Sequence, residues 1–271
     1  MTADVAVRTG VHPVEDRGDG PPVLWLSSAF AEAPWLPVHD RLLAHGHRLV
    51  VPHAPSVQPG GVLEDVRAMA DYVLHLVDVL DALGLDRLPV VGTSFGGWVA
   101  AELAARHPER VAGLALVDAM GLRVEGQPAA ELFALNLAGL AALLLHDRRA
   151  VDVAALPAFD RQADPMTSVA RMIVGQEAMA RLGWSPYLHD PGLPGRLPRW
   201  SRPERPPERE APPALVVWGD DDRVLPEGHA HAWCDLLGAP LEVVTGAGHL
   251  PAVEQPDRVA ALLAPFLTAV P

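Results

Sequence analysis

The sequence is poor in cysteine, in basic residues and in long apolar runs. Its 271 residues include a single cysteine, Cys234, so no disulfide can form within the chain, as is usual in a reducing compartment. Lys and Arg total 21 against 34 Asp and Glu, a net charge of −13 that repels nucleic acid phosphates and anionic membranes. We therefore expect neither nucleic acid nor membrane as a partner.

Targeting and cofactor signals are also missing. Residues 1–19 are polar and acidic and lack the apolar segment of a secretory signal. The longest apolar stretch, Phe133–Leu145, is interrupted by Asn136 and is too short to cross a bilayer. No G-x-G-x-x-G or Walker pattern occurs, so no nucleotide site is indicated. These observations predict a cytoplasmic protein that needs no cofactor.

Short apolar runs alternate with helical periodicity over most of the chain. Strands are expected at 23–26, 49–51, 88–91, 114–117, 215–218 and 241–244, with two more β-like runs within 5–14. Helices are expected at 60–83, from 96 to 107, at 229–237 and at 252–266. Such alternation predicts an α/β fold with a doubly wound, mostly parallel sheet.

The alternation lapses between residues 119 and 209. Only two helical segments, 131–145 and 169–182, are expected there, and the loops around them are rich in proline and arginine. We predict a core formed by 1–118 and 210–271 and an inserted, mainly helical lid formed by 119–209. The run RPERPPEREAPP at 202–213 is interpreted as the tether that returns the lid to the core, with a disordered interdomain linker as the alternative.

Residues 88–103, LPVVGTSFGGWVAAEL, combine an apolar strand, a tight turn and an alanine-rich helix. Ser94 stands at the apex, and Gly92 and Gly96 flank it where a side chain would collide with the turn. A serine in this position exposes its hydroxyl at the carboxyl end of the strand. The pattern favours a nucleophile, the alternative being a glycine-rich turn that binds an anion at the helix N-terminus.

A serine hydroxyl needs a base, usually a histidine that a carboxylate orients. Two later strand ends supply such groups. Asp220, Asp221 and Asp222 follow the strand at 215–218, and His249 lies in the glycine-rich loop after 241–244. Asp118, which follows the strand at 114–117, is a rival acid.

These segments resemble the α/β-hydrolases. G-T-S-F-G at 92–96 matches their nucleophile elbow, W-G-D-D-D-R-V-L-P at 218–226 resembles W-G-x-x-D-x-x-x-P, and G-A-G-H-L-P at 246–251 resembles G-x-G-H-x-P. The resemblance implies a catalytic triad of Ser94, Asp222 and His249. Residues 94–104 and the E-Q-P-D at 254–257 resemble a branch that includes bacterial serine esterases and carbon–carbon bond hydrolases of the meta-cleavage type.

One loop departs from the family pattern. After the strand at 23–26 the family usually has His-Gly, whereas this chain has Ser27-Ser28. The resemblance implies an oxyanion hole formed by the backbone N–H groups of Phe95 and Ala29. The Cβ of Ser28 could alter that hole, and losing one donor costs roughly 10²–10³ in turnover.

The substrate pocket and metal binding are indicated less directly. Candidate substrate-binding residues come from the loop after 23–26 and from the apolar lid helix, which needs a surface to cover: Ser28, Phe30, Phe133, Leu137 and Leu140. No metal is expected, because no acid or cysteine completes a ligand set with either His45-x-His47 or His229-x-His231.

The features together predict a serine hydrolase that cleaves an ester, a thioester or an activated carbon–carbon bond of a small organic substrate. A non-hydrolytic lyase or cyclase that uses the same triad is an alternative, as is a ligand-binding protein with little activity. A homodimer is left open.

Overall fold

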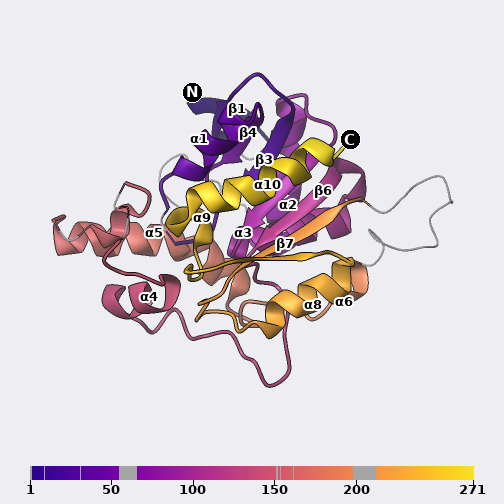
Figure 1. Cartoon of the computed structure of the whole chain (residues 1–271). Helices are drawn as coiled ribbons and strands as arrows, with labels where there is room; N and C mark the ends of the chain where they lie inside the picture. Colours follow the sequence, from indigo (N-terminus) through magenta and orange to yellow (C-terminus); the bar gives the residue numbers. More distant parts are fainter. Residues whose placement is uncertain are drawn as a thin grey trace.

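A central sheet of eight strands organises the molecule (Figure 1), in the order β1-β2-β4-β3-β5-β6-β7-β8. The computed structural model describes residues 2–8, 10–30, 32–54, 66–150, 152, 154–160, 162–197 and 212–271. β2 pairs antiparallel with β1 and with β4, and every later pairing is parallel. The predicted doubly wound, mostly parallel sheet is confirmed.

The parallel strands are short apolar runs, buried because helices cover both faces of the sheet. The strands are β1 (Thr2–Val7), β2 (Gly10–Arg17), β3 (Pro22–Leu26), β4 (Arg48–Pro52), β5 (Leu88–Thr93), β6 (Val111–Val117), β7 (Ala214–Gly219) and β8 (Leu241–Val244). All seven residues of β6 are buried, whereas β8 at the edge of the sheet exposes Glu242 and Val243.

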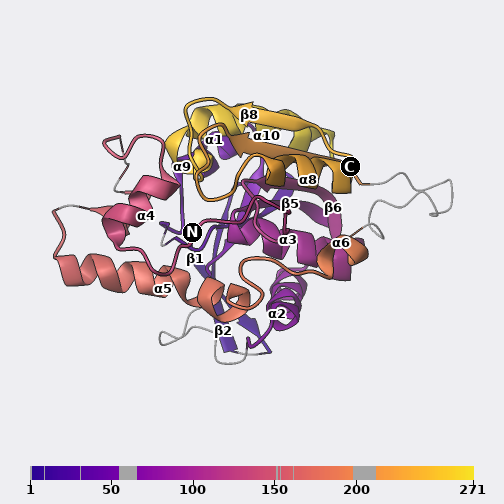
Figure 2. The same ribbon diagram turned by 90° about the horizontal axis from the view of Figure 1, so that it is seen from below.

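Helices flank this sheet on two sides (Figure 2). On one face lie α1 (Pro37–Ala44) and α10 (Pro256–Ala269), and on the other lie α2 (Met69–Ala82) and α3 (Phe95–Arg106). The shorter elements are η1 (Pro108–Arg110), α8 (Gly228–Leu237), which packs against β7, and α9 (Pro251–Glu254). The helix expected at 60–83 begins at Met69, because Asp71 accepts the N–H groups of Arg67 and Ala68 and starts the first turn there. Residues 60–65 lie outside the described part.

Between β6 and β7 the chain forms a helical insertion, with α4 (Leu137–Leu144), η2 (Pro157–Phe159), α5 (Pro165–Gly183) and α6 (Leu193–Arg196). Figures 1 and 2 both place α4 and α5 together at one end of the molecule. The helix expected at 131–145 starts six residues later, because the Asn136 side chain accepts the Gly139 N–H at 2.9 Å and caps it. The helix expected at 169–182 lies within α5, which begins four residues earlier and ends one residue later.

Several expectations are not tested by this architecture. The boundaries of core and lid stay a prediction, and most of the expected tether at 202–213 lies outside the described residues. Within the described ranges, none of the helices combines the length and the apolar character needed to cross a bilayer. The cytoplasmic location and a homodimer remain predictions.

Candidate active site

Ser94 occupies the turn between β5 and α3 with a strained backbone, at φ 51° and ψ −117°. Gly92 and Gly96, two residues before and two after Ser94, are glycines because neither position has room for a Cβ atom. A Cβ added to Gly92 would lie 2.5 Å from the Gly96 carbonyl oxygen, and one added to Gly96 would lie 2.2 Å from the Leu26 carbonyl oxygen. A positive φ at a non-glycine residue is costly and is tolerated mainly at functional sites.

Two hydrogen bonds connect Ser94 to a histidine and an acid from distant strand ends. Ser94 Oγ lies 2.7 Å from His249 Nε2, and His249 Nδ1 lies 2.8 Å from Asp222 Oδ2. The other carboxylate oxygen of Asp222 accepts the backbone N–H groups of Val224 and Leu225 at 2.8 and 2.9 Å. An acceptor at Nδ1 keeps the proton on that nitrogen, which leaves Nε2 free to accept the serine proton.

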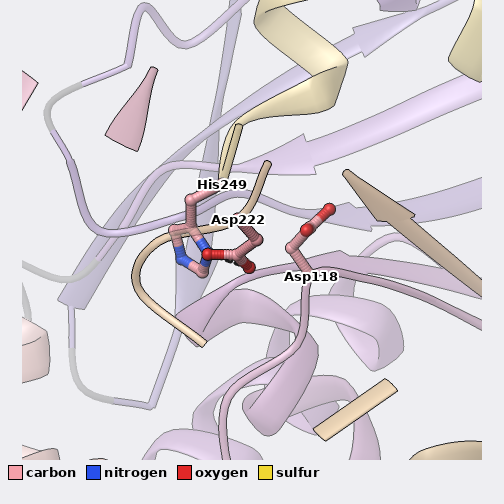
Figure 3. A group of neighbouring side chains, drawn as sticks. All are labelled: Asp118, Asp222 and His249. Carbon is pink, nitrogen blue, oxygen red and sulfur yellow. Dashed lines mark hydrogen bonds and ion pairs between the residues drawn. The ribbon is translucent and has the colours of Figure 1, made fainter. Parts of the chain in front are cut away.

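Asp118, the rival acid, lies beside Asp222 but does not bond to the histidine (Figure 3). Its Oδ1 accepts the Gly219 N–H at 3.0 Å. Burial and the charge of Asp222 raise the pKa of Asp118 well above its usual value. The structure therefore brings Asp222, rather than Asp118, to the histidine.

One oxygen each of Asp118 and Asp222 and a ring nitrogen of His249 lie within 4.8 Å of one another, close enough to be considered as metal ligands. Both ring nitrogens of His249 are already engaged, by Asp222 and by Ser94. The donor set thus fits a hydrogen-bonded triad better than a metal site, and the expectation of no metal stays a prediction.

The loop after β3 lies directly against this turn. Ala29 and Phe30 are buried, and the Phe30 ring meets the His249 ring edge to face at 5.8 Å between centroids. Among the described residues, the backbone N–H groups of Phe95 and Ala29 have no hydrogen-bond partner. Both of the donors expected for an oxyanion hole are therefore available to a ligand.

The helical insertion also reaches the site. The His249 N–H donates to the Leu144 carbonyl at the end of α4, at 2.8 Å. Glu254 accepts the N–H of Gly248 at 2.7 Å and that of His146 at 2.8 Å, which ties the histidine loop to the residues after α4. In the sequence, Glu254 is recognisable only as part of E-Q-P-D, because its partner His146 lies more than a hundred residues away.

A comparison with known proteins agrees with this geometry. Residues 33–256 match the family model described as alpha/beta hydrolase fold. The chain belongs to the α/β-hydrolase fold family.

Individual α/β-hydrolases give closer comparisons. Over 127 residues the chain is 35% identical to the 2-hydroxy-6-oxo-2,4-heptadienoate hydrolase of Pseudomonas putida, a match that covers 44% of each protein. The chain thus spans less than half the length of that relative. The meta-cleavage product hydrolase CumD of Pseudomonas fluorescens IP01 has a similar structure, with a TM-score of 0.74 at 20% identity over 98% of this chain and 97% of that chain.

The 2-hydroxy-6-oxo-6-phenylhexa-2,4-dienoate hydrolase of Rhodococcus sp. strain RHA1 is also similar in structure, with a TM-score of 0.71 at 21% identity over 99% of both chains. The resemblance to the meta-cleavage branch, expected from the sequence, is confirmed by these relatives.

Two cavities of this α/β-hydrolase lie beside the insertion. One, of about 590 Å³, lies between α4, η2 and α5 and is lined by Leu137. The other, of about 690 Å³, lies between the loop after β3, the end of β4 and α5, and is lined by Ser27, Ser28 and Glu32 among others. Ser28 is only 4% exposed, and its hydroxyl has no hydrogen-bond partner among the described residues.

The remaining predicted substrate-binding residues have varied surroundings. Leu140 is buried, and the Phe133 ring packs against Trp184 and Tyr187 at 5.2 and 6.0 Å between centroids. Phe30 contacts the histidine rather than a cavity. The substrate-binding roles of these residues stay predictions.

Proposed function

We propose that this α/β-hydrolase is a serine hydrolase, with Ser94 as nucleophile, His249 as base and Asp222 as the acid that orients it. The single observation that carries the proposal is the unbroken chain of hydrogen bonds from Ser94 Oγ through the imidazole to the Asp222 carboxylate, at 2.7 and 2.8 Å. The three side chains are buried, so these bonds act in a medium of low dielectric.

In the proposed reaction, His249 Nε2 takes the proton of Ser94 as the serine oxygen attacks a carbonyl carbon. Asp222 stabilises the resulting imidazolium, and the N–H groups of Phe95 and Ala29 bind the negative oxygen. The carbonyl re-forms, and the leaving group departs with the proton from His249. Water then repeats both steps on the acyl-enzyme and releases a carboxylic acid and free Ser94.

The proposed substrate is a small ester, thioester or activated ketone, because these are the carbonyl groups that a serine nucleophile attacks. The cavity of about 690 Å³ beside the loop after β3 has room for a small organic molecule, and none of the triad residues lines it. The carbon–carbon option is supported by the relatives, which are named as hydrolases of dienoates or of meta-cleavage products. In that reaction the leaving carbon, rather than an oxygen or sulfur, receives the proton.

Substrate entry requires movement, because Ser94 is 0% exposed and His249 is 1% exposed. We propose that the helical insertion acts as a lid. Two contacts support this role: α4 ends on the histidine loop, and Gly183 at the end of α5 lies close to Trp98 and Phe95 in the turn and helix after Ser94.

Labelling with a fluorophosphonate probe tests the function. The wild-type protein should be labelled covalently, and Ser94→Ala should not be labelled while it keeps the wild-type circular dichroism spectrum and melting temperature. Hydrolysis of p-nitrophenyl acetate should be lost in the same variant. A folded wild-type protein that neither reacts with the probe nor hydrolyses the ester would overturn the proposal and favour the lyase or ligand-binding alternatives.

A further inference from the structure

Glu32 belongs to none of the sequence motifs, yet its carboxylate contacts the loop that carries a proposed oxyanion donor. Glu32 Oε2 accepts the Ser28 N–H at 2.9 Å. The next N–H along the chain is that of Ala29, which has no partner among the described residues. Glu32 therefore holds the peptide immediately before the donor and leaves the donor itself open.

We propose that Glu32 is a positioning residue of the active site, that its neutral acid is the form that supports catalysis, and that its ionisation lowers activity at alkaline pH. This inference rests on the serine hydrolase function proposed above, and it adds a residue and a pH dependence that the triad does not contain.

The surroundings of Glu32 favour the neutral form. Burial raises the pKa of Glu32 to about 7, and the opposing effects of Ser28 and of the charge of His249 are smaller. His249, after β8, acts on Glu32 through its charge, and His53 after β4 and Arg171 on α5 line the same cavity as Glu32. Among the described residues none of them forms an ion pair with Glu32, and Arg171 instead donates to the Pro157 carbonyl at 3.2 Å.

A negative charge at Glu32 opposes the reaction. Attack by Ser94 places a negative charge about 3 Å from the Ala29 N–H, one residue away from the peptide that Glu32 contacts. An ionised carboxylate there repels the oxyanion in a buried site where charges are poorly screened. The neutral acid still accepts the Ser28 N–H through its carbonyl oxygen, so it holds the loop without that repulsion.

The expected pH profile of kcat/KM therefore has an alkaline limb that Glu32 sets. On the alkaline side, activity falls as Glu32 ionises. An acid with a pKa of about 7 is neutral in only about 3% of molecules at pH 8.5, so the fall can reach about 30-fold.

Three variants separate the two roles of Glu32 in hydrolysis of p-nitrophenyl acetate between pH 5.5 and 9. Glu32→Gln keeps an oxygen that accepts the Ser28 N–H but cannot ionise, so it should lose the alkaline fall and exceed wild type by up to about 30-fold at pH 8.5. Glu32→Ala removes the acceptor and should lower kcat at every pH with a smaller change in KM. Glu242→Gln, at an exposed position on β8, should leave the profile unchanged.

Titration of the glutamate side-chain carboxyls by carbon-13 NMR distinguishes this inference from the proposed function, because it needs no turnover. The resonance that disappears in Glu32→Gln should titrate near pH 7 in the wild-type protein. Titration near pH 4.5, or a Glu32→Gln profile that overlays that of wild type, would overturn the inference while leaving the serine hydrolase intact. A protein inert to the fluorophosphonate probe would overturn the function even if Glu32 titrates as expected. Should Glu32→Ala not fold, Glu32→Gln and the NMR titration still decide the question.

Discussion

The two halves of the proposed oxyanion hole are built by opposite means. The turn around Ser94 is held by the absence of side chains, since added Cβ atoms at Gly92 and Gly96 would lie 2.5 and 2.2 Å from backbone oxygens. The loop Ser27–Glu32 is held by a side chain, because the Glu32 carboxyl accepts the Ser28 N–H. The first half therefore has no room for a side chain at Gly92 or Gly96 and has no titratable group, whereas the second half responds to both substitution and pH.

The largest effect is expected from Asp222, which bonds to His249 and so orients that ring toward Ser94 in the first half. Asp222→Asn should lower kcat by about 10⁴, as in a serine protease, because the imidazole loses the acceptor that sets its tautomer. Asp118→Asn is the matched control. It should change kcat only a fewfold, since Asp118 does not bond to His249 and an amide oxygen can still accept the Gly219 N–H. Equal losses in the two variants, measured by steady-state kinetics, would mean that both carboxyls serve the histidine.

Gly96→Ala tests how rigid the first half is. The new methyl group would press on the carbonyl oxygens of Leu26 and Ser27, which are backbone atoms and cannot rotate away. The variant should lose about 3 kcal/mol in chemical denaturation, at the upper end of overpacking costs, along with most of its turnover. Gly195→Ala, where no atom lies within 4 Å of the added Cβ, should leave stability unchanged or slightly raised. If Gly96→Ala proves as stable as wild type, the turn is softer than its geometry indicates.

Glu32→Gln tests the second half, the loop after β3, through the pH dependence of protein stability. Glu32 has a folded-state pKa of about 7, raised from 4.5, so the folded protein retains a proton that the unfolded chain releases between these pH values. Wild-type stability should therefore fall as the pH rises from 4.5 through 7, relative to the variant. The gain of Glu32→Gln should reach at most roughly 3 kcal/mol at pH 8 and vanish below pH 4.5. Thermal unfolding at several pH values measures it, and a gain independent of pH would exclude Glu32 as the titrating group.

The smallest effect is expected from Ser28→Gly. Glu32 binds the backbone N–H of Ser28, which the substitution keeps, and the hydroxyl that it removes has no partner among the described residues. Hydrolysis of p-nitrophenyl acetate should stay within a fewfold of wild type. A rise in esterase activity would instead show that Ser28 holds the loop away from a hydrolytic geometry. A large loss would point to the Ser28 hydroxyl as a donor to the substrate.

The strand pattern and the turn at Ser94 were predictable because both depend on neighbouring residues. Apolar runs between turn residues locate the strands, and Gly92 and Gly96 on either side of Ser94 favour a tight turn between strand and helix. Helix ends were less predictable. The Asn136 side chain caps the start of α4 by accepting the Gly139 N–H, and the apolar run that begins upstream does not predict this start. The raised pKa of Asp118 was not predictable from the sequence either, because it depends on burial and on the neighbouring Asp222.

By itself, the sequence determined the fold class and identified Ser94, His249 and two candidate acids at strand ends, since strand–turn–helix order and short motifs are local features of the chain. Only the tertiary structure decided that Asp222 rather than Asp118 bonds to His249, that Glu254 joins the insertion to the histidine loop, and that Glu32 is an acid with a pKa of about 7. Glu32 and Ser28 are four residues apart and could pair in a short peptide. The environment that keeps the acid neutral, however, is assembled from β4, α5 and the loop after β8, because desolvation depends on every group that surrounds a charge.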